Sequence, residues 1–173
     1  VSPGDHQSGP GGVKPVRRAY YILGMRILLI GATGTIGQAI AQTLAARHDL
    51  ILASRHRAAQ QVDITNPDSI RALFGRVGKV DAIVSAAGQA AFKPLDQLTD
   101  GDFTLSLGSK LMGQVNLVRF GLGSVNDRGS ITLTSGVLAQ HPAPGTAAIS
   151  MVNAGLEGFT RAAALEAPRG IRV

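Results

Sequence analysis

The sequence predicts an α/β domain in which a doubly wound parallel sheet lies between two layers of helices, a three-layer αβα arrangement. Short apolar runs alternate with segments whose apolar residues recur at helical spacing, the order that parallel strands and crossover helices require. A length of 173 residues suits a single domain. A glycine-rich turn also separates the first apolar run from the first helical segment, as expected where a strand passes directly into a crossover helix.

The strands are recognised as short apolar runs. Residues 26–30 (Arg-Ile-Leu-Leu-Ile) are almost continuously apolar, which is typical of a strand buried on both faces of a parallel sheet. Similar short runs predict four more strands. A sixth run at the chain's end looks like a strand that is cut short. The predicted strands are 26–30, 50–53, 61–64, 81–84, 130–134 and 171–173.

The helices lie between these strands. The first, 35–47, has Ile36, Ile40 and Leu44 at helical spacing. The second opens at Asn66-Pro67, because Asn is a good N-cap and Pro is favoured at the first helical position. It is predicted to run to about residue 77. Two longer helices are predicted at 99–122 and 146–167.

The composition narrows the class of protein. Hydrophobic residues make up 45% and charged residues 16%, too apolar for a disordered chain. No stretch approaches 18 uninterrupted apolar residues, so we expect no membrane-spanning helix. The chain has no cysteine, which excludes disulfides, thiolate metal sites and a cysteine nucleophile, and no metal site is expected. This composition favours a cytoplasmic protein.

The charge balance indicates an anionic partner. The formal net charge is +6, from 17 Lys and Arg against 11 Asp and Glu. The basic residues are scattered, aromatic residues are only 4% and tryptophan is absent, so stacking platforms for nucleic acid are not expected. An anionic small molecule suits this composition better.

The first part of the chain differs from the rest. Residues 1–24 are rich in Pro and Gly and then basic, and they lack the long apolar run of a secretory signal. We expect a flexible N-terminal extension or tag there, with Met25 as the natural start. We expect one nucleotide-binding domain over residues 25–173.

The turn Gly31-Ala32-Thr33-Gly34-Thr35-Ile36-Gly37 indicates a phosphate site. Glycines there permit a tight turn and a close approach of the backbone, and the N–H groups at the start of the following helix face an anion. The turn lacks the Gly-Lys-Ser/Thr ending of a nucleoside-triphosphate loop. The alternative is a turn whose glycines serve packing alone. We expect a dinucleotide to contact Gly31, Thr33, Gly34, Thr35, Ile36 and Gly37.

The end of the second strand points to the kind of dinucleotide. A carboxylate there would hold a ribose 2′-hydroxyl, whereas an arginine can pair with a 2′-phosphate. The segment Ala53-Ser54-Arg55-His56-Arg57 has no carboxylate. Arg55 could stack on adenine and reach the phosphate, and Ser54 could donate a hydrogen bond. The sequence therefore favours NADP(H) over NAD(H), the alternative being a solvated basic turn.

From Met25 onward the chain resembles the short-chain dehydrogenase/reductase family. Gly31 to Gly37 is similar to its cofactor loop, with GxxGxxG spacing, and Asp63-Ile64 to the pair that contacts adenine. Ser85-Ala86-Ala87-Gly88 is similar to the Asn-Asn-Ala-Gly segment beside the cofactor. The segments 156–162 and 164–166 are also close to family sequence. The resemblance implies a Rossmann-like fold and hydride transfer between a nicotinamide and a carbonyl or alcohol.

The catalytic pattern of that family is missing. Aligned without gaps, the Tyr position is Ile149, the Lys position Asn153, the Ser position Gly136 and the Asn position Lys110. Isoleucine can neither donate nor accept a proton, so the family's usual proton transfer is excluded. Lys110 and Ser135 are the candidates to substitute for it. His141, in the loop after the fifth strand, is a weaker one.

The end of the chain departs from the family as well. Family members continue through a sixth strand and a substrate lid, so we expect a domain truncated in strand six. A circular permutation is the alternative, because Val1-Ser2-Pro3-Gly4 resembles the text expected after Val173.

Three functions remain open. The first is an NADP(H)-dependent oxidoreductase with a nonstandard proton donor, acting on a small-molecule substrate. The second is a catalytically silent NADP(H)-binding sensor or subunit, and the third is a non-functional fragment. The apolar faces of helices 103–122 and 146–167 are similar to those that pair in family dimers, so a homo-oligomer is expected; those faces could equally be core.

Overall fold

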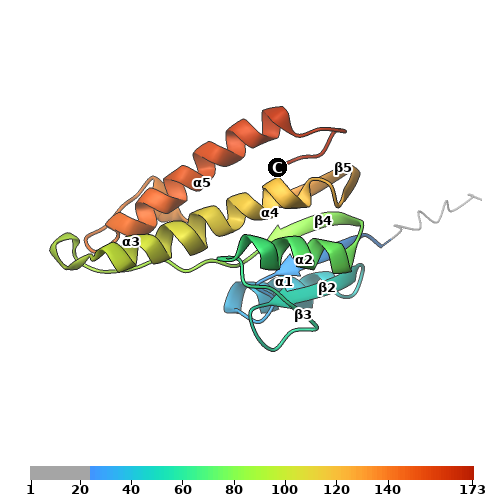
Figure 1. Cartoon of the computed structure of the whole chain (residues 1–173), viewed down its shortest axis with the longest axis horizontal. Helices are drawn as coiled ribbons and strands as arrows, with labels where there is room; N and C mark the ends of the chain where they lie inside the picture. Colours follow the sequence, from blue (N-terminus) through green and yellow to red (C-terminus); the bar gives the residue numbers. More distant parts are fainter. Residues whose placement is uncertain (1–23) are drawn as a thin grey trace, which may run out of the picture.

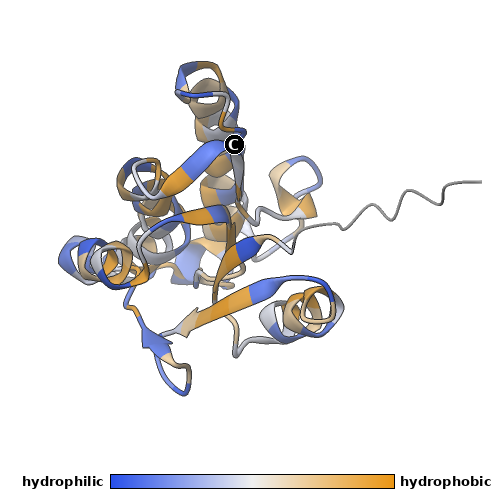
Figure 2. Cartoon of the chain, turned by 90° about the vertical axis from the view of Figure 1, so that its right-hand side faces the viewer, coloured by the Kyte–Doolittle hydropathy of each residue, from blue (hydrophilic) through white to orange (hydrophobic). Residues whose placement is uncertain are grey.

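The computed structural model describes residues 24–173, which form one α/β domain around a five-stranded parallel sheet of order β3-β2-β1-β4-β5. The predicted extension, residues 1–24, lies outside the described residues except for Gly24. Helices α2, α4 and α5 lie on one side of the sheet and α1 on the other (Figures 1 and 2). The predicted three-layer fold is confirmed.

Strands β1, β2 and β4 follow the predicted apolar runs, whereas β5, predicted at 130–134, begins five residues earlier, at Val125. Strand β1 at the centre pairs with β2 and β4, and its last four residues are buried on both faces, as a continuous apolar run requires. The bounds are β1 Arg26–Ile30, β2 Asp49–Ser54, β3 Gln60–Gln61, β4 Val80–Ser85 and β5 Val125–Thr132.

Helices α2 and α3 begin where the capping signals place them. Asn66 accepts hydrogen bonds from the backbone amides of Asp68 and Ser69, and Pro67 opens α2. Thr99 and Asp102 form a capping box at the start of α3. The bounds are α1 Thr35–Leu44, α2 Pro67–Val77, α3 Asp100–Ser106, α4 Gln114–Gly121 and α5 Ala147–Glu166, with short 3₁₀ turns η1 Leu95–Gln97 and η3 Val137–Ala139.

Several predicted bounds were wrong. The third strand is only Gln60–Gln61, because the chain turns away from the sheet after Val62. The helix predicted at 99–122 contains a π-helical segment, η2 Leu107–Gly113, between α3 and α4. The segment predicted as a sixth strand, 171–173, makes one parallel bridge, between Arg172 and Ser130.

The main core lies between the sheet and the helices α2, α4 and α5. It joins residues of all the major strands to the inward faces of those helices, and its members include Leu28, Ile30, Ile70, Leu73, Ile83, Leu117, Val125 and Ile131. No helix within residues 24–173 combines the length and the apolar character needed to cross a membrane.

Candidate functional site

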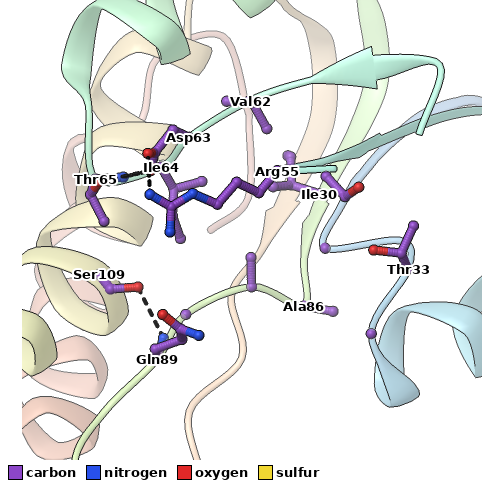
Figure 3. Close-up of a pocket in the computed structure, with 15 residues that line it drawn as sticks. Ile30, Thr33, Arg55, Val62, Asp63, Ile64, Thr65, Ala86, Gln89 and Ser109 are labelled. Atoms are coloured by element: carbon purple, nitrogen blue, oxygen red, sulfur yellow. Dashed lines mark hydrogen bonds and ion pairs between the residues drawn. The ribbon is translucent and has the colours of Figure 1, made fainter. Parts of the chain in front are cut away.

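A cavity of about 210 Å³ opens where the central strands β1, β2 and β4 end (Figure 3). This is the edge at which open parallel sheets bind ligands. Its walls come from the glycine turn, from the end of β2, from the segment after β3, from the loop after β4 and from η2. The residues lining it are Ile30, Gly31, Thr33, Gly34, Ser54, Arg55, Val62, Asp63, Ile64, Thr65, Ala86, Ala87, Gly88, Gln89 and Ser109.

The glycine turn is held against the rest of the site by contacts that leave no room for side chains. Gly31 has φ +86°, and a Cβ added there would lie 2.6 Å from the carbonyl oxygen of Ala86. A Cβ on Gly37 would lie 2.0 Å from the carbonyl oxygen of Gly31. The first turn of α1, which follows directly, has no side-chain cap at Gly34. Its backbone N–H groups are therefore available to an anion.

Ten of the residues predicted to contact a cofactor line this one cavity: Gly31, Thr33, Gly34, Ser54, Arg55, Asp63, Ile64, Ala86, Ala87 and Gly88. The other four do not. Gly37 and Ser85 are buried behind the cavity, while Thr35 and Ile36 are exposed in the first turn of α1.

Five lining residues were missed by sequence reasoning: Ile30, Val62, Thr65, Gln89 and Ser109. Ile30 and Val62 sit directly beside predicted residues, so adjacency could have found them. Ser109 carries no such signal, because it lies on η2, away in the sequence from the residues predicted to contact a cofactor. Its hydroxyl accepts a hydrogen bond from the backbone amide of Gln89, 3.0 Å away.

Arg55 and Asp63 form an ion pair across the cavity. Arg55 Nη2 lies 2.8 Å from Asp63 Oδ2. The other carboxylate oxygen, Oδ1, accepts hydrogen bonds from Thr65 N at 3.0 Å and Thr65 Oγ1 at 2.7 Å (Figure 3). Burial alone would raise the pKa of Asp63, but the Thr65 hydrogen bonds and the Arg55 charge outweigh it, so this pKa lies below its usual value.

Ser54 lies beside this pair at the end of β2. It is buried, and its hydroxyl donates a hydrogen bond to the backbone carbonyl of His56. That contact fixes the turn after β2, from which Arg55 extends. The hydroxyl proton predicted for a phosphate is thus used within the chain.

Lys110, one of the two candidate proton donors, lies behind the cavity on η2. Its Nζ donates a hydrogen bond to the carbonyl oxygen of Thr134, 2.8 Å away, and the stem packs against Gly88. Burial lowers the pKa of the Lys110 ammonium. Gln114 Nε2 donates to the same Thr134 oxygen at 3.1 Å.

Ser135, the other candidate, is bound to α5. Its hydroxyl donates to Glu157 Oε1 at 2.8 Å and makes a longer contact of 3.3 Å with the carbonyl oxygen of Asn153. Gln140 donates to the second oxygen of Glu157. Neither Ser135 nor Lys110 is among the residues lining the cavity.

The helix positions expected to hold the family's Tyr and Lys face inward. Ile149 is 7% exposed and Asn153 is 2% exposed. Asn153 Oδ1 has no hydrogen-bond partner among the described residues. A Cβ on the adjacent Gly136 would lie 2.9 Å from Asn153 Nδ2. His141, by contrast, is exposed in its loop.

Comparison with known proteins now identifies the family. Residues 31–173 match a family model described as enoyl-(acyl carrier protein) reductase. The chain belongs to the short-chain dehydrogenase/reductase family. Among curated proteins, hydroxynaphthalene reductase arp2 of Aspergillus fumigatus is 31% identical over 116 residues, 65% of this chain and 42% of that protein. A hydroxynaphthalene reductase-like protein Arp2 of Metarhizium brunneum is 28% identical over 84% of this chain and 64% of its own length. The chain thus spans less than two thirds of the length of these curated relatives.

Solved structures share the fold. The protein lin1944 from Listeria innocua is 48% identical, with a TM-score of 0.84 over 86% of this chain and 74% of that one. A small-chain dehydrogenase in complex with NADPH is 27% identical, with a TM-score of 0.80 over 87% of this chain and 68% of that one. The predicted Rossmann-like fold and family are confirmed.

Proposed function

We propose that this short-chain family member binds NADP(H) and transfers hydride between the nicotinamide and a carbonyl or alcohol substrate, using a proton donor other than tyrosine. The observation that supports it is the single cavity that unites the glycine turn with Arg55 at the end of β2. A family relationship supports oxidoreductase chemistry, and one solved neighbour is an NADPH complex.

The residues present fit a dinucleotide. Gly31 and Gly37 allow close backbone packing of the turn that any Cβ would block, and the uncapped start of α1 leaves N–H groups for a pyrophosphate. Ile64 and Ala87 supply apolar wall for an adenine ring. When bound, the nicotinamide supplies or accepts the hydride. The chain itself binds and orients the dinucleotide and has to move the accompanying proton.

Arg55 carries the preference for NADP(H). Its side chain is 59% exposed and lies at the cavity, and among the described residues only one of its nitrogens, Nη2, is engaged, with Asp63. The remaining N–H groups are free to form charge-assisted hydrogen bonds to a 2′-phosphate. A ribose 2′-hydroxyl offers no matching charge.

The preference is tested by fluorescence titration of NADPH and NADH. We expect Arg55→Ala to weaken NADPH binding at least tenfold, because hydrogen bonds to charged groups contribute about 1.5–3 kcal/mol. The same variant should change the affinity for NADH less than twofold. Arg57→Ala is the matched control, because Arg57 is exposed, lies two residues further along the chain and loses the same charge. It should change the affinity for neither nucleotide. Equal losses for both nucleotides would reject the 2′-phosphate role.

The proton has to come from a group other than residue 149. Lys110 can donate through its ammonium and Ser135 through its hydroxyl, provided each leaves its present acceptor. NADPH oxidation is followed with aldehydes, ketones and quinones, including naphthalene-derived ketones because relatives are named hydroxynaphthalene reductases. We expect either Lys110→Met or Ser135→Ala to reduce turnover about 100- to 10,000-fold while NADPH still binds.

A second function is favoured by the burial of Ile149 and Asn153. Because both side chains at the family's catalytic positions are packed inward, the chain could bind NADP(H) as a silent sensor or subunit. NADPH binding without oxidation by any member of the panel would select this reading for those substrates.

We also propose a homo-oligomer through α4 and α5. Met112 of η2 and Met151 of α5 are 41% and 42% exposed, and a groove between α4 and α5 is lined by Val118, Leu122 and Phe159. Burial of such surface between copies would stabilise a dimer. Analytical ultracentrifugation at micromolar concentration should show it, and a monomer alone would contradict it. The cytoplasmic location stays a prediction.

A further inference from the structure

Both oxygens of the Asp63 carboxylate accept hydrogen bonds from neighbouring side chains or backbone. Thr65 engages Oδ1 twice and Arg55 engages Oδ2, as described above. The backbone amide of Asp63 also donates to Ser69 Oγ at 2.9 Å. Each carboxylate oxygen of Asp63 therefore has a donor. The negative charge of Asp63 acts directly on its ion-pair partner Arg55.

The ion pair neutralises the cavity. Among the described residues that line it, Arg55 is the sole cation and Asp63 the sole anion. A 2′-phosphate that approaches Arg55 has to compete with the carboxylate for the guanidinium. A 2′-hydroxyl carries no charge and does not compete for it. Asp63 is thus positioned to weaken the binding of NADP(H) and to leave the binding of NAD(H) unaffected.

We propose that Asp63 is a specificity-determining residue that limits the preference for NADP(H) by holding Arg55, and that binding exchanges the Arg55–Asp63 ion pair for a contact between Arg55 and the 2′-phosphate. This inference rests on the proposed function. It assigns Asp63 a role through Arg55, different from the direct adenine contact that the family resemblance implies.

The test uses two ligands that differ only in the 2′-phosphate, adenosine 2′,5′-bisphosphate and AMP, by isothermal titration calorimetry. Asp63→Asn keeps the size of the side chain and presents no charge to Arg55. We expect it to bind the bisphosphate about fivefold more tightly, the upper range for releasing an exposed ion pair, and AMP within twofold of the parent. Asp68→Asn, an exposed carboxylate outside the cavity, is the matched control and should change neither.

The double variant separates the proposal from a simple charge effect. In an Arg55→Ala background, Asp63→Asn should improve bisphosphate binding less than twofold. An equal improvement in both backgrounds would show that the carboxylate acts by its own charge, and a parallel loss for both ligands would show a direct adenine contact; either overturns the proposal. If the bisphosphate binds but Asp63→Asn has no effect or weakens it, the proposal fails while the proposed function stands. If neither ligand nor NADPH binds the parent protein, the proposed function itself fails. Far-UV circular dichroism confirms that each variant is folded.

Discussion

Gly37 offers a direct test of how the glycine turn is built. An alanine Cβ at this buried position would lie 2.0 Å from the carbonyl oxygen of Gly31 and 2.9 Å from Ala32 Cα. To reach an ordinary contact of 3.4 Å, the turn has to move away from α1 by about 1.4 Å. The obstacle is backbone, so no side-chain rotation relieves it. We expect Gly37→Ala to destabilise the protein by about 3 kcal/mol, the upper part of the usual range for overpacking.

The control for this variant lies three residues earlier. A Cβ on Gly34 would be 3.5 Å from the same carbonyl oxygen, and its φ of −81° suits any residue. Gly34→Ala should therefore stay within about 1 kcal/mol of the parent, the loss expected at an N-cap. Urea unfolding followed by far-UV circular dichroism gives both values, and Gly37→Ala should lower Tm by about 6–12 °C. If the two variants unfold within about 1 kcal/mol of each other, the close packing of turn on helix is refuted.

Three further predictions concern single side chains. Asn66→Ala removes the acceptor of two backbone amides at the start of α2. In urea unfolding it should therefore lower the free energy of unfolding by about 1 kcal/mol, whereas Asn66→Asp should retain most of the parent's stability. Gly88 has φ +135° and lies against Lys110, with a Cβ only 2.9 Å from Lys110 Cδ, so Gly88→Ala should lose about 2 kcal/mol in the same assay, and a neutral result would contradict the backbone strain. The hydrogen bond from Lys93, with those of the helix cap, lowers the pKa of Asp102 to about 2; since this folded-state pKa lies below the unfolded value, its stabilisation is complete above about pH 4 and is lost as the pH falls toward 2. NMR titration of the Asp102 carboxyl group measures its pKa directly, and a midpoint near pH 4 would contradict the lowered pKa.

The parts of the fold that could be predicted are those with local signals. The apolar run of β1 passes into the glycine turn and then α1 within a dozen residues, and Asn66-Pro67 marks the start of α2 by backbone chemistry alone. In both places the determining contacts join residues close in the chain. Their bounds accordingly agree with the structure to within a few residues.

The parts that could not be predicted depend on contacts between distant segments. The strand expected at 61–64 stops at Gln61, because the amide of Asp63 bonds to Ser69 and turns the chain toward the cavity. Ser109 reaches the site through the π-helical turn of η2, for which the sequence has no periodic signature. The pairing of Arg55 with Asp63 likewise joins two segments whose separate motifs predicted separate roles.

The two halves of the candidate site make different demands on the sequence. The part proposed to bind phosphate is built from backbone N–H groups and from glycines that admit close packing, so most other positions around it can vary. The proton transfer of the proposed function needs particular titratable side chains, and at residues 149 and 153 this chain has a buried isoleucine and a buried asparagine on α5. Under the proposed function, the proton donor therefore has to come from outside those two positions of α5. Lys110, on η2, has a titratable ammonium in contact with the segment that follows β5, but because Lys110 does not line the cavity it has to leave Thr134 before it can donate a proton there.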